Sequence, residues 1–145
     1  MTNRRTFLQT ALGAAAARAA KPSPWEWQHY GADAGATRYA PLDQINRSNV
    51  QRLRVAWTYR TGDAAQRPVT TIECTPIAVD GVLYLTTAQL KVQALDAATG
   101  KPLWRFDPSA GARRRPGVSR GVTFWQDPDN PKIRRIYAPL RDQLF

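Results

Sequence analysis

Side chains that could act as nucleophiles or metal ligands are few in this chain of 145 residues. The chain contains one cysteine, Cys74, and one histidine, His29. A single cysteine excludes an internal disulfide, and a single histidine excludes a metal site built from histidines. We expect Cys74 to be a small buried residue on a strand and His29 to lie at the surface.

Basic residues dominate the charge, with 21 Lys and Arg against 11 Asp and Glu. Arg4, Arg5 and Arg18 lie in the first 20 residues, which hold no acidic residue, so 18 basic and 11 acidic residues remain after them. A basic surplus is typical of proteins that bind nucleic acid or membrane surfaces. Apart from the run Arg113-Arg114-Arg115, however, the basic residues are scattered and form no binding motif. The pattern therefore favours a solvated surface and predicts no nucleic-acid partner.

Residues 1–20, MTNRRTFLQTALGAAAARAA, have the layout of a signal peptide. The pair Arg4-Arg5 precedes a weakly apolar run, and small residues surround a cleavage point after Ala19 or Ala20. The segment from Asn3 to Gln9 resembles the twin-arginine export motif, which a receptor reads as an address. The alternative is an alanine-rich helix of the mature protein. We therefore expect a twin-arginine signal over residues 1–20 and export to the periplasm.

Residues 21–145 are predicted to form one β domain. A hydrophobic content of 43% and a charged content of 22% are ordinary for a globular protein and disfavour disorder. Apart from a short helix over residues 49–53, capped by Ser48, the predicted elements are strands. The strands are expected over residues 53–59, 75–79, 82–87, 91–95, 103–106, 121–126 and 133–138. Asp80-Gly81 and residues 96–101 are expected to form tight turns. No long apolar run spans a membrane, so this domain should be soluble or peripherally attached.

Two aromatic pairs recur at the length of one propeller blade. Trp57 and Trp104 are 47 residues apart, and Tyr84 and Tyr137 are 53 residues apart. A four-stranded blade takes about 40–50 residues, so the spacing predicts propeller blades with the two tryptophans at equivalent places in neighbouring four-stranded sheets. Because the recurrence has only two instances, a β-sandwich stays open as an alternative.

Several ordered motifs resemble the PQQ-dependent (quinoprotein) dehydrogenase family. Residues 94–104, ALDAATGKPLW, resemble the motif that locks adjacent blades in that family. Residues 38–46, RYAPLDQIN, are similar to its N-terminal signature, and residues 73–77, ECTPI, continue the similarity. The resemblance runs from about Trp25 to Tyr137, nearly all of the mature chain. It implies an eight-bladed β-propeller, of which this all-β chain would supply the N-terminal blades.

The family resemblance also implies a chemistry. Its members hold PQQ over a calcium ion in the axial funnel and oxidise alcohols or aldose sugars, passing the electrons to a respiratory acceptor. Glu73, in the context Glu-x-Thr-Pro, resembles the first-blade glutamate beside PQQ. Arg120, before Gly121-Val122, resembles the arginine that pairs with a PQQ carboxylate. These two are the expected cofactor-binding residues. Their alternatives are a blade-edge carboxylate and a solvated or salt-bridging arginine.

The chain departs from the alcohol-oxidising members at one position. Many of those carry two adjacent cysteines that form a disulfide against the PQQ ring, where this chain reads Arg114-Arg115. The chain is therefore more similar to the glucose-dehydrogenase-like branch. Trp125, just beyond Arg120, is expected either near the pocket or packed on a strand.

Length distinguishes the remaining functional hypotheses. Eight blades need at least about 320 residues, so 125 mature residues make about three blades, and the sequence stops inside a β unit. We expect the calcium ligands and the catalytic aspartate, which belong to later blades, to be absent, and this chain alone neither to catalyse nor to bind PQQ stably. The competing hypotheses are a non-catalytic envelope propeller that binds other proteins and an inactive truncated product. The leader lacks the cysteine that a lipoprotein of the envelope class would carry.

Overall fold

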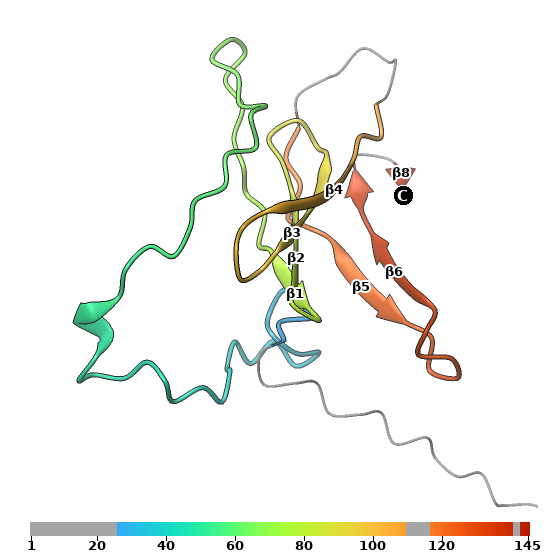
Figure 1. Cartoon of the computed structure of the whole chain (residues 1–145). Coiled ribbons are helices and arrows are strands. Elements are labelled where there is room, and N and C mark those ends of the chain that lie inside the picture. Colours follow the sequence, from blue (N-terminus) through green and yellow to red (C-terminus); the bar gives the residue numbers. More distant parts are fainter. Residues whose placement is uncertain (1–25, 110–116, 141–142) are drawn as a thin grey trace, which may run out of the picture.

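The computed structural model describes residues 26–109, 117–140 and 143–145, and in them the regular structure is β apart from one 3-10 turn. Figure 1 shows a four-stranded antiparallel sheet with a separate hairpin beside it. The sheet has the order β1-β2-β3-β4, followed by the pairs β5-β6 and β7-β8. The elements are η1 (Val50–Arg52), β1 (Ile77–Val79), β2 (Val82–Thr86), β3 (Val92–Asp96), β4 (Pro102–Phe106), β5 (Thr123–Gln126), β6 (Arg134–Tyr137), β7 (Pro139–Leu140) and β8 (Gln143–Leu144).

The predicted turn at Asp80-Gly81 is confirmed and joins β1 to β2. Both residues have positive φ, 48° and 73°, which a two-residue hairpin turn of this twist requires. The register pairs Val79 with Val82 and Ile77 with Tyr84. This register places Ile77, Val79, Val82 and Tyr84 on the same face of the sheet, and Ile77 and Tyr84 pack in the core.

The second predicted turn, over residues 96–101, closes the hairpin between β3 and β4. The Asp96 carboxylate accepts hydrogen bonds from the backbone N–H and the hydroxyl of Thr99, both at 2.7 Å. The Gly100 N–H donates to the Asp96 carbonyl at 2.8 Å, and the Asp96 N–H donates to the Lys101 carbonyl at 2.9 Å. The Thr99 hydroxyl, followed by the Thr99 N–H, lowers the pKa of Asp96 below its ordinary value of 3.8.

This pKa shift predicts how the turn responds to acid. A carboxyl group whose pKa is depressed by folding stabilises the folded state above its unfolded pKa, and that contribution disappears as the pH falls through the folded value. We expect backbone amide exchange at Thr99 and Gly100 to accelerate, relative to the intrinsic rate, as the pH falls below 3.8. Thr99→Val removes the first of the two bonds and should shrink this acid response. An acid response of the same size in Thr99→Val would contradict the assignment.

The segment before the sheet corrects two predictions. Residues 53–59, expected as a strand, pair with no strand among the described residues and form extended chain that leads from η1 back toward the sheet (Figure 1). Val55, in the middle of this segment, is 82% exposed. The prediction failed because an alternating pattern shows that a segment suits a strand but does not supply a neighbouring strand with which it can pair. The helix expected over residues 49–53 is a single 3-10 turn without a side-chain cap, since the Ser48 hydroxyl donates to Asn46 Oδ1 instead.

Trp57 contacts the sheet at the turn between β3 and β4. Its indole Nε1–H donates to the Ala97 carbonyl at 3.1 Å, and its ring covers Gly100, where an added Cβ would lie 2.5 Å from Cε3. Trp104 lies on β4. The prediction that the two tryptophans occupy equivalent places in neighbouring four-stranded sheets was therefore wrong. Among the described residues, Trp57 belongs to no sheet and packs on Gly100, in the turn before the strand that holds Trp104.

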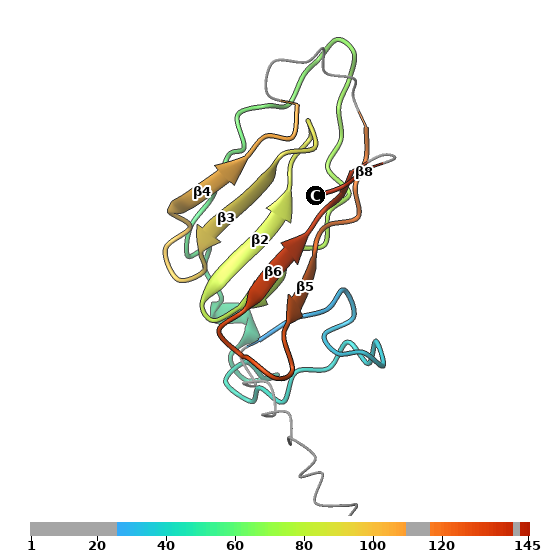
Figure 2. The same ribbon diagram turned by 90° about the vertical axis from the view of Figure 1, so that its right-hand side faces the viewer.

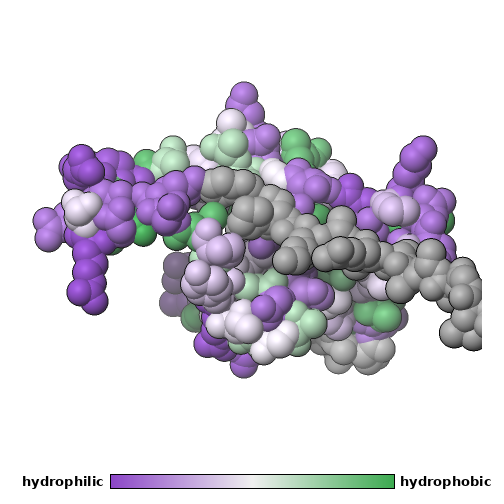
Figure 3. Space-filling view, turned by 90° about the horizontal axis from the view of Figure 1, so that it is seen from below, coloured by the Kyte–Doolittle hydropathy of each residue, from purple (hydrophilic) through white to green (hydrophobic). Residues whose placement is uncertain are grey.

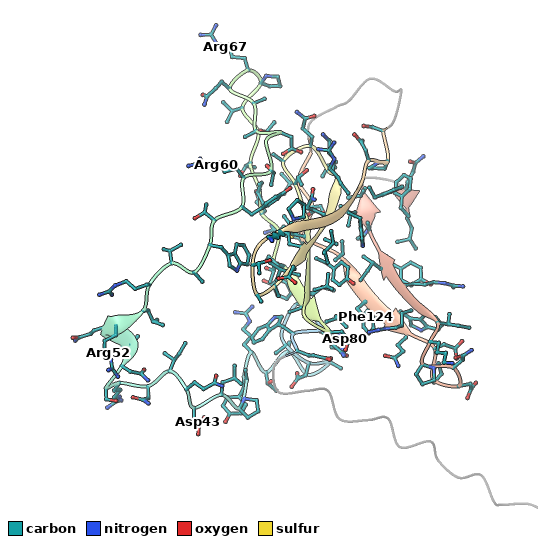
Figure 4. The ribbon with its side chains drawn as sticks, in the orientation of Figure 1. Asp43, Arg52, Arg60, Arg67, Asp80 and Phe124 are labelled. Carbon is teal, nitrogen blue, oxygen red and sulfur yellow. The ribbon has the colours of Figure 1, made fainter. Side chains whose placement is uncertain are left out.

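The core joins the sheet to the β5-β6 hairpin, which lies against it in the view of Figure 2. The buried apolar cluster contains Ile77, Leu90, Val92, Val122, Ala138 and Leu140. Arg134 of β6 adds a polar link, because it forms an ion pair with Asp80 and lies 5.8 Å over the Phe124 ring. Figure 4 shows Asp80 and Phe124 at the same end of the two sheets. The β5-β6 hairpin is thus attached to the sheet through the buried apolar cluster and through the ion pair at the β1-β2 turn.

Strand β4 is the exposed outer strand of the sheet. All five of its residues are exposed. Trp104 and Phe106 line a cavity of about 210 Å³ together with Val92, Ile136, Ala138 and the C-terminal Phe145. The view from below in Figure 3 shows hydrophilic residues at both ends of the molecule and separate apolar spots between them. Among the described residues no helix has the length and apolar character of a membrane span.

Candidate cofactor-binding site

Glu73 and Arg120 lie at the starts of two different sheets. Glu73 comes four residues before β1, and Arg120 comes three residues before β5. The structure brings them together, because Arg120 Nη1 lies 3.1 Å from Glu73 Oε2. Two residues singled out in the sequence by separate motifs therefore form one ion pair.

The backbone fixes this meeting point. The Thr75 N–H donates to the Arg120 carbonyl at 3.0 Å, so the two segments are joined beside the ion pair. Gly121 follows with φ of +132°, and a Cβ at this position would lie 2.8 Å from the Thr75 carbonyl oxygen. Only glycine accommodates both this conformation and this close approach. Gly121 is thus required by the contact between the two segments, directly after Arg120.

The two charged side chains differ in exposure. The Arg120 side chain is 81% exposed and that of Glu73 is 38% exposed. A guanidinium has five N–H donors in a planar fork, so a single contact with Glu73 leaves donors directed to solvent. The pair can therefore present an oriented cation to an anionic ligand, for which a carboxylate is the matching partner.

Other residues singled out in the sequence lie elsewhere. His29 is exposed, as predicted. Trp125 lies on β5, where Arg135 stacks 5.5 Å over its ring. The run Arg113-Arg114-Arg115 and the leader 1–20 lie outside the described residues. Within the described part of the chain, no three His, Cys, Asp or Glu side chains are grouped so that they could hold a metal ion.

Three residues that hold the segment around Glu73 were not recognised as site residues from the sequence, namely Asp63, Cys74 and Thr87. Cys74 lies just before β1 and not on a strand, contrary to the prediction, and it is half-buried. Its Sγ accepts a hydrogen bond from the Thr86 N–H at 3.2 Å. Asp63 is 6% exposed and accepts a hydrogen bond from the Thr87 hydroxyl. A single acidic residue in a loop carries no pattern that marks it as buried.

The sequence of this chain matches a known protein family. A family model described as glucose/ethanol/alcohol dehydrogenase, beta-propeller domain (PQQ) matches residues 27–145. The dehydrogenase subunit of the quinone alcohol dehydrogenase of Gluconobacter oxydans is 42% identical over 112 residues, which are 70% of this chain and 14% of that protein. The quinoprotein glucose dehydrogenase of Escherichia coli is 38% identical over 130 residues, which are 81% of this chain and 16% of that protein.

A solved structure agrees with these sequence matches. The structure of a quinohemoprotein alcohol dehydrogenase from Pseudomonas putida HK5 superposes with a TM-score of 0.64 at 36% identity, covering 80% of this chain and 16% of that one. The chain thus spans about a sixth of the length of these relatives. The sheet β1-β4 with its successor β5-β6 corresponds to part of their propeller, which confirms the predicted fold class. The chain therefore belongs to the PQQ-dependent glucose, ethanol and alcohol dehydrogenase family and carries part of its β-propeller domain.

Proposed function

We propose that this chain contributes one wall of the PQQ site in an oxidoreductase that oxidises an alcohol or an aldose sugar. The observation that supports the proposal is the ion pair between Glu73 and Arg120, at 3.1 Å, in a chain that belongs to this family. The pair joins the start of the first sheet to the start of the next, so it lies where two blades meet. An envelope propeller that only binds proteins has no chemical need for this pair.

The residues fit the carboxylate side of PQQ. PQQ carries three carboxylates, and Arg120 offers an exposed guanidinium that can donate two parallel hydrogen bonds to one of them. Glu73 holds the guanidinium in place through Nη1 and partly balances its charge. The close approach of Gly121 to Thr75 fixes the backbone from which Arg120 extends. When bound, PQQ supplies the two-electron acceptor, while the protein supplies position and electrostatics.

We further propose a substrate of the aldose class, with electrons passing from PQQ to a respiratory acceptor. The sequence Arg114-Arg115 stands where alcohol-oxidising members have their cysteine pair, which favours the glucose-dehydrogenase-like branch. Calcium beside PQQ, and the carboxylate that accepts the substrate proton, are assigned to the part of the propeller that this chain does not include. On this proposal, the 145-residue chain by itself turns over no substrate.

Two preparations test the proposed function. The first is the 145-residue chain with PQQ and calcium, assayed by dye reduction with glucose and with simple alcohols. The second is a chimera in which residues 27–145 replace the matching segment of the Escherichia coli quinoprotein glucose dehydrogenase, to which the chain is 38% identical. We expect turnover with the chimera only. Turnover by the chain alone, or a folded chimera that fails to bind PQQ, would contradict the proposal.

We also propose that residues 1–20 direct export to the periplasm by the twin-arginine route. The sequence places Arg4-Arg5 before Phe7-Leu8, within an apolar run of low hydrophobicity. Replacing both arginines with lysine should stop delivery of a reporter fused after residue 30, because the receptor reads the guanidinium pair and not charge alone. The control is Arg18→Lys, which leaves the pair intact. Unchanged periplasmic delivery of the double-lysine variant would exclude this route.

A further inference from the structure

The loop that leads to Glu73 projects from the sheet as a narrow hairpin. Residues Gln66 and Val69 form an isolated bridge, and the Thr70 N–H donates to the Ala65 carbonyl at 3.1 Å. Arg67 lies at the outer tip of this loop, far from the sheets, in Figure 4. Within the described part of the chain, no hydrogen bond or ion pair links the tip to Glu73, so we take the position of Glu73 to depend on the two ends of the loop, at Asp63 and Cys74.

The first end is held by a buried carboxylate. Asp63 Oδ2 accepts a hydrogen bond of 2.5 Å from the Thr87 hydroxyl, and the Gln89 side-chain amide donates to the Asp63 carbonyl at 3.0 Å. The Thr87 hydroxyl in turn accepts from the Lys91 N–H at 3.2 Å, which fixes its direction. Asp63 is 6% exposed, and its other oxygen, Oδ1, is buried without a hydrogen-bond partner among the described residues. A buried carboxylate with one unsatisfied oxygen is costly, so its location calls for a reason other than stability.

The second end of the loop, at Cys74, is held by Thr86, the residue before Thr87. The Thr86 N–H donates to Cys74 Sγ at 3.2 Å. Thr86 is the last residue of β2 and is 1% exposed, so this donor is fixed by the core of the sheet. Immediately after Cys74, the Thr75 N–H turns away from β2 to the Arg120 carbonyl. Thr86 and Thr87 thus hold both ends of the loop at one point of the sheet.

We infer that Asp63 is a positioning residue for Glu73, acting through the Thr87 hydroxyl to hold the Glu73-Cys74-Thr75 segment against Arg120. The inference rests on the proposed function in one respect, namely that Glu73 and Arg120 belong to the PQQ site. Its structural content is independent of PQQ. Without the bond from Thr87, the 63–75 segment loses one of the hydrogen bonds that attach it to residues 86–89. The first consequence is a weaker bond between the Thr75 N–H and the Arg120 carbonyl.

The test measures backbone amide exchange in the 145-residue chain without PQQ. Thr87→Val removes the hydroxyl at nearly unchanged shape, Thr87→Ser keeps it, and Asp63→Ala removes its acceptor. The matched control is Thr58→Val, the same change at an exposed threonine. One hydrogen bond corresponds to a change of about five- to tenfold, so Thr87→Val and Asp63→Ala should each speed exchange at Thr75 by about that factor. Exchange over β3 and β4 reports whether each variant is folded.

Thr87→Val and Asp63→Ala remove the same hydrogen bond, between the Thr87 hydroxyl and Asp63 Oδ2. A double variant therefore distinguishes the loss of this one bond from two independent destabilising effects. The double variant should exchange no faster at Thr75 than either single variant, and Thr87→Ser should resemble the unchanged chain. Unchanged exchange at Thr75 in both single variants, or effects that multiply in the double variant, would overturn the inference. Failure of the proposed function would appear separately, as a chimera that does not bind PQQ while the exchange results stand.

Discussion

Replacing Arg120 with alanine is expected to weaken PQQ binding about 10- to 150-fold. Hydrogen bonds to charged groups are worth about 1.5–3 kcal/mol, and each 1.4 kcal/mol is about tenfold in affinity. The loss is large because the exposed guanidinium is already held by Glu73 at 3.1 Å, and alanine leaves no donor in its place. The measurement is a PQQ titration of the chimera that carries residues 27–145, at fixed calcium.

Two further variants make this prediction specific to the fork of Arg120. Arg120→Lys keeps the charge but loses the planar pair of donors, so it should recover only part of the affinity. Arg60→Ala removes the same charge from an exposed arginine on the extended segment, which Figure 4 shows well away from the sheets. It should leave binding unchanged. PQQ affinity equal to that of the unchanged chimera in Arg120→Ala would remove Arg120 from the site.

Gly100→Ala is expected to destabilise the chain by about 2–5 kcal/mol. Placing a Cβ at a left-handed position costs about 1–2 kcal/mol, and forcing an atom into a packed contact costs about 1–3 kcal/mol. Both terms apply, since Gly100 has φ of +70° and an added Cβ would lie 2.5 Å from the Trp57 ring. The Trp57 indole would have to leave the turn and lose its bond to the Ala97 carbonyl. Urea unfolding followed by circular dichroism measures the change.

Gly81→Ala separates the two contributions. Gly81 has nearly the same φ, +73°, but nothing lies within 4 Å of the added Cβ. It should therefore show only the backbone cost of about 1–2 kcal/mol. Equal destabilisation by the two substitutions would show that the Trp57 contact contributes nothing. Faster exchange of the Trp57 indole N–H, confined to Gly100→Ala, would locate the effect at Trp57.

Local signals in the sequence predicted the hairpins of the sheet well. Asp80-Gly81 and residues 96–101 carry the backbone requirements of their turns in their residue types, so β1 to β4 follow from short-range information. The failure at residues 53–59 has the opposite cause. Alternation shows that a segment suits a pleated surface, but the partner that would complete the sheet is not encoded in the segment itself.

The candidate site was predictable in part. Glu73 and Arg120 were identified by motifs, and the structure shows them in contact, although their role toward PQQ is a proposal. Asp63, Cys74 and Thr87 were not identified, because their importance comes from hydrogen bonds between distant segments. The pair β7-β8 was also missed, since a two-residue strand that begins at Pro139 leaves almost no periodic signal.

The hydrogen bond between the Trp57 indole and the Ala97 carbonyl can form only late in synthesis and folding. It joins residues 40 positions apart, whereas the hairpins from β1 to β4 connect neighbours in sequence. Contacts between distant residues close late in folding, because the chain between them must first lose its freedom. During synthesis at about 5–20 residues per second, Trp57 waits about 2–8 s for its acceptor to be made. Through that interval the Trp57 indole has neither its acceptor nor the turn on which it packs, so it stays in solvent until the segment from Ala97 to Gly100 has been made.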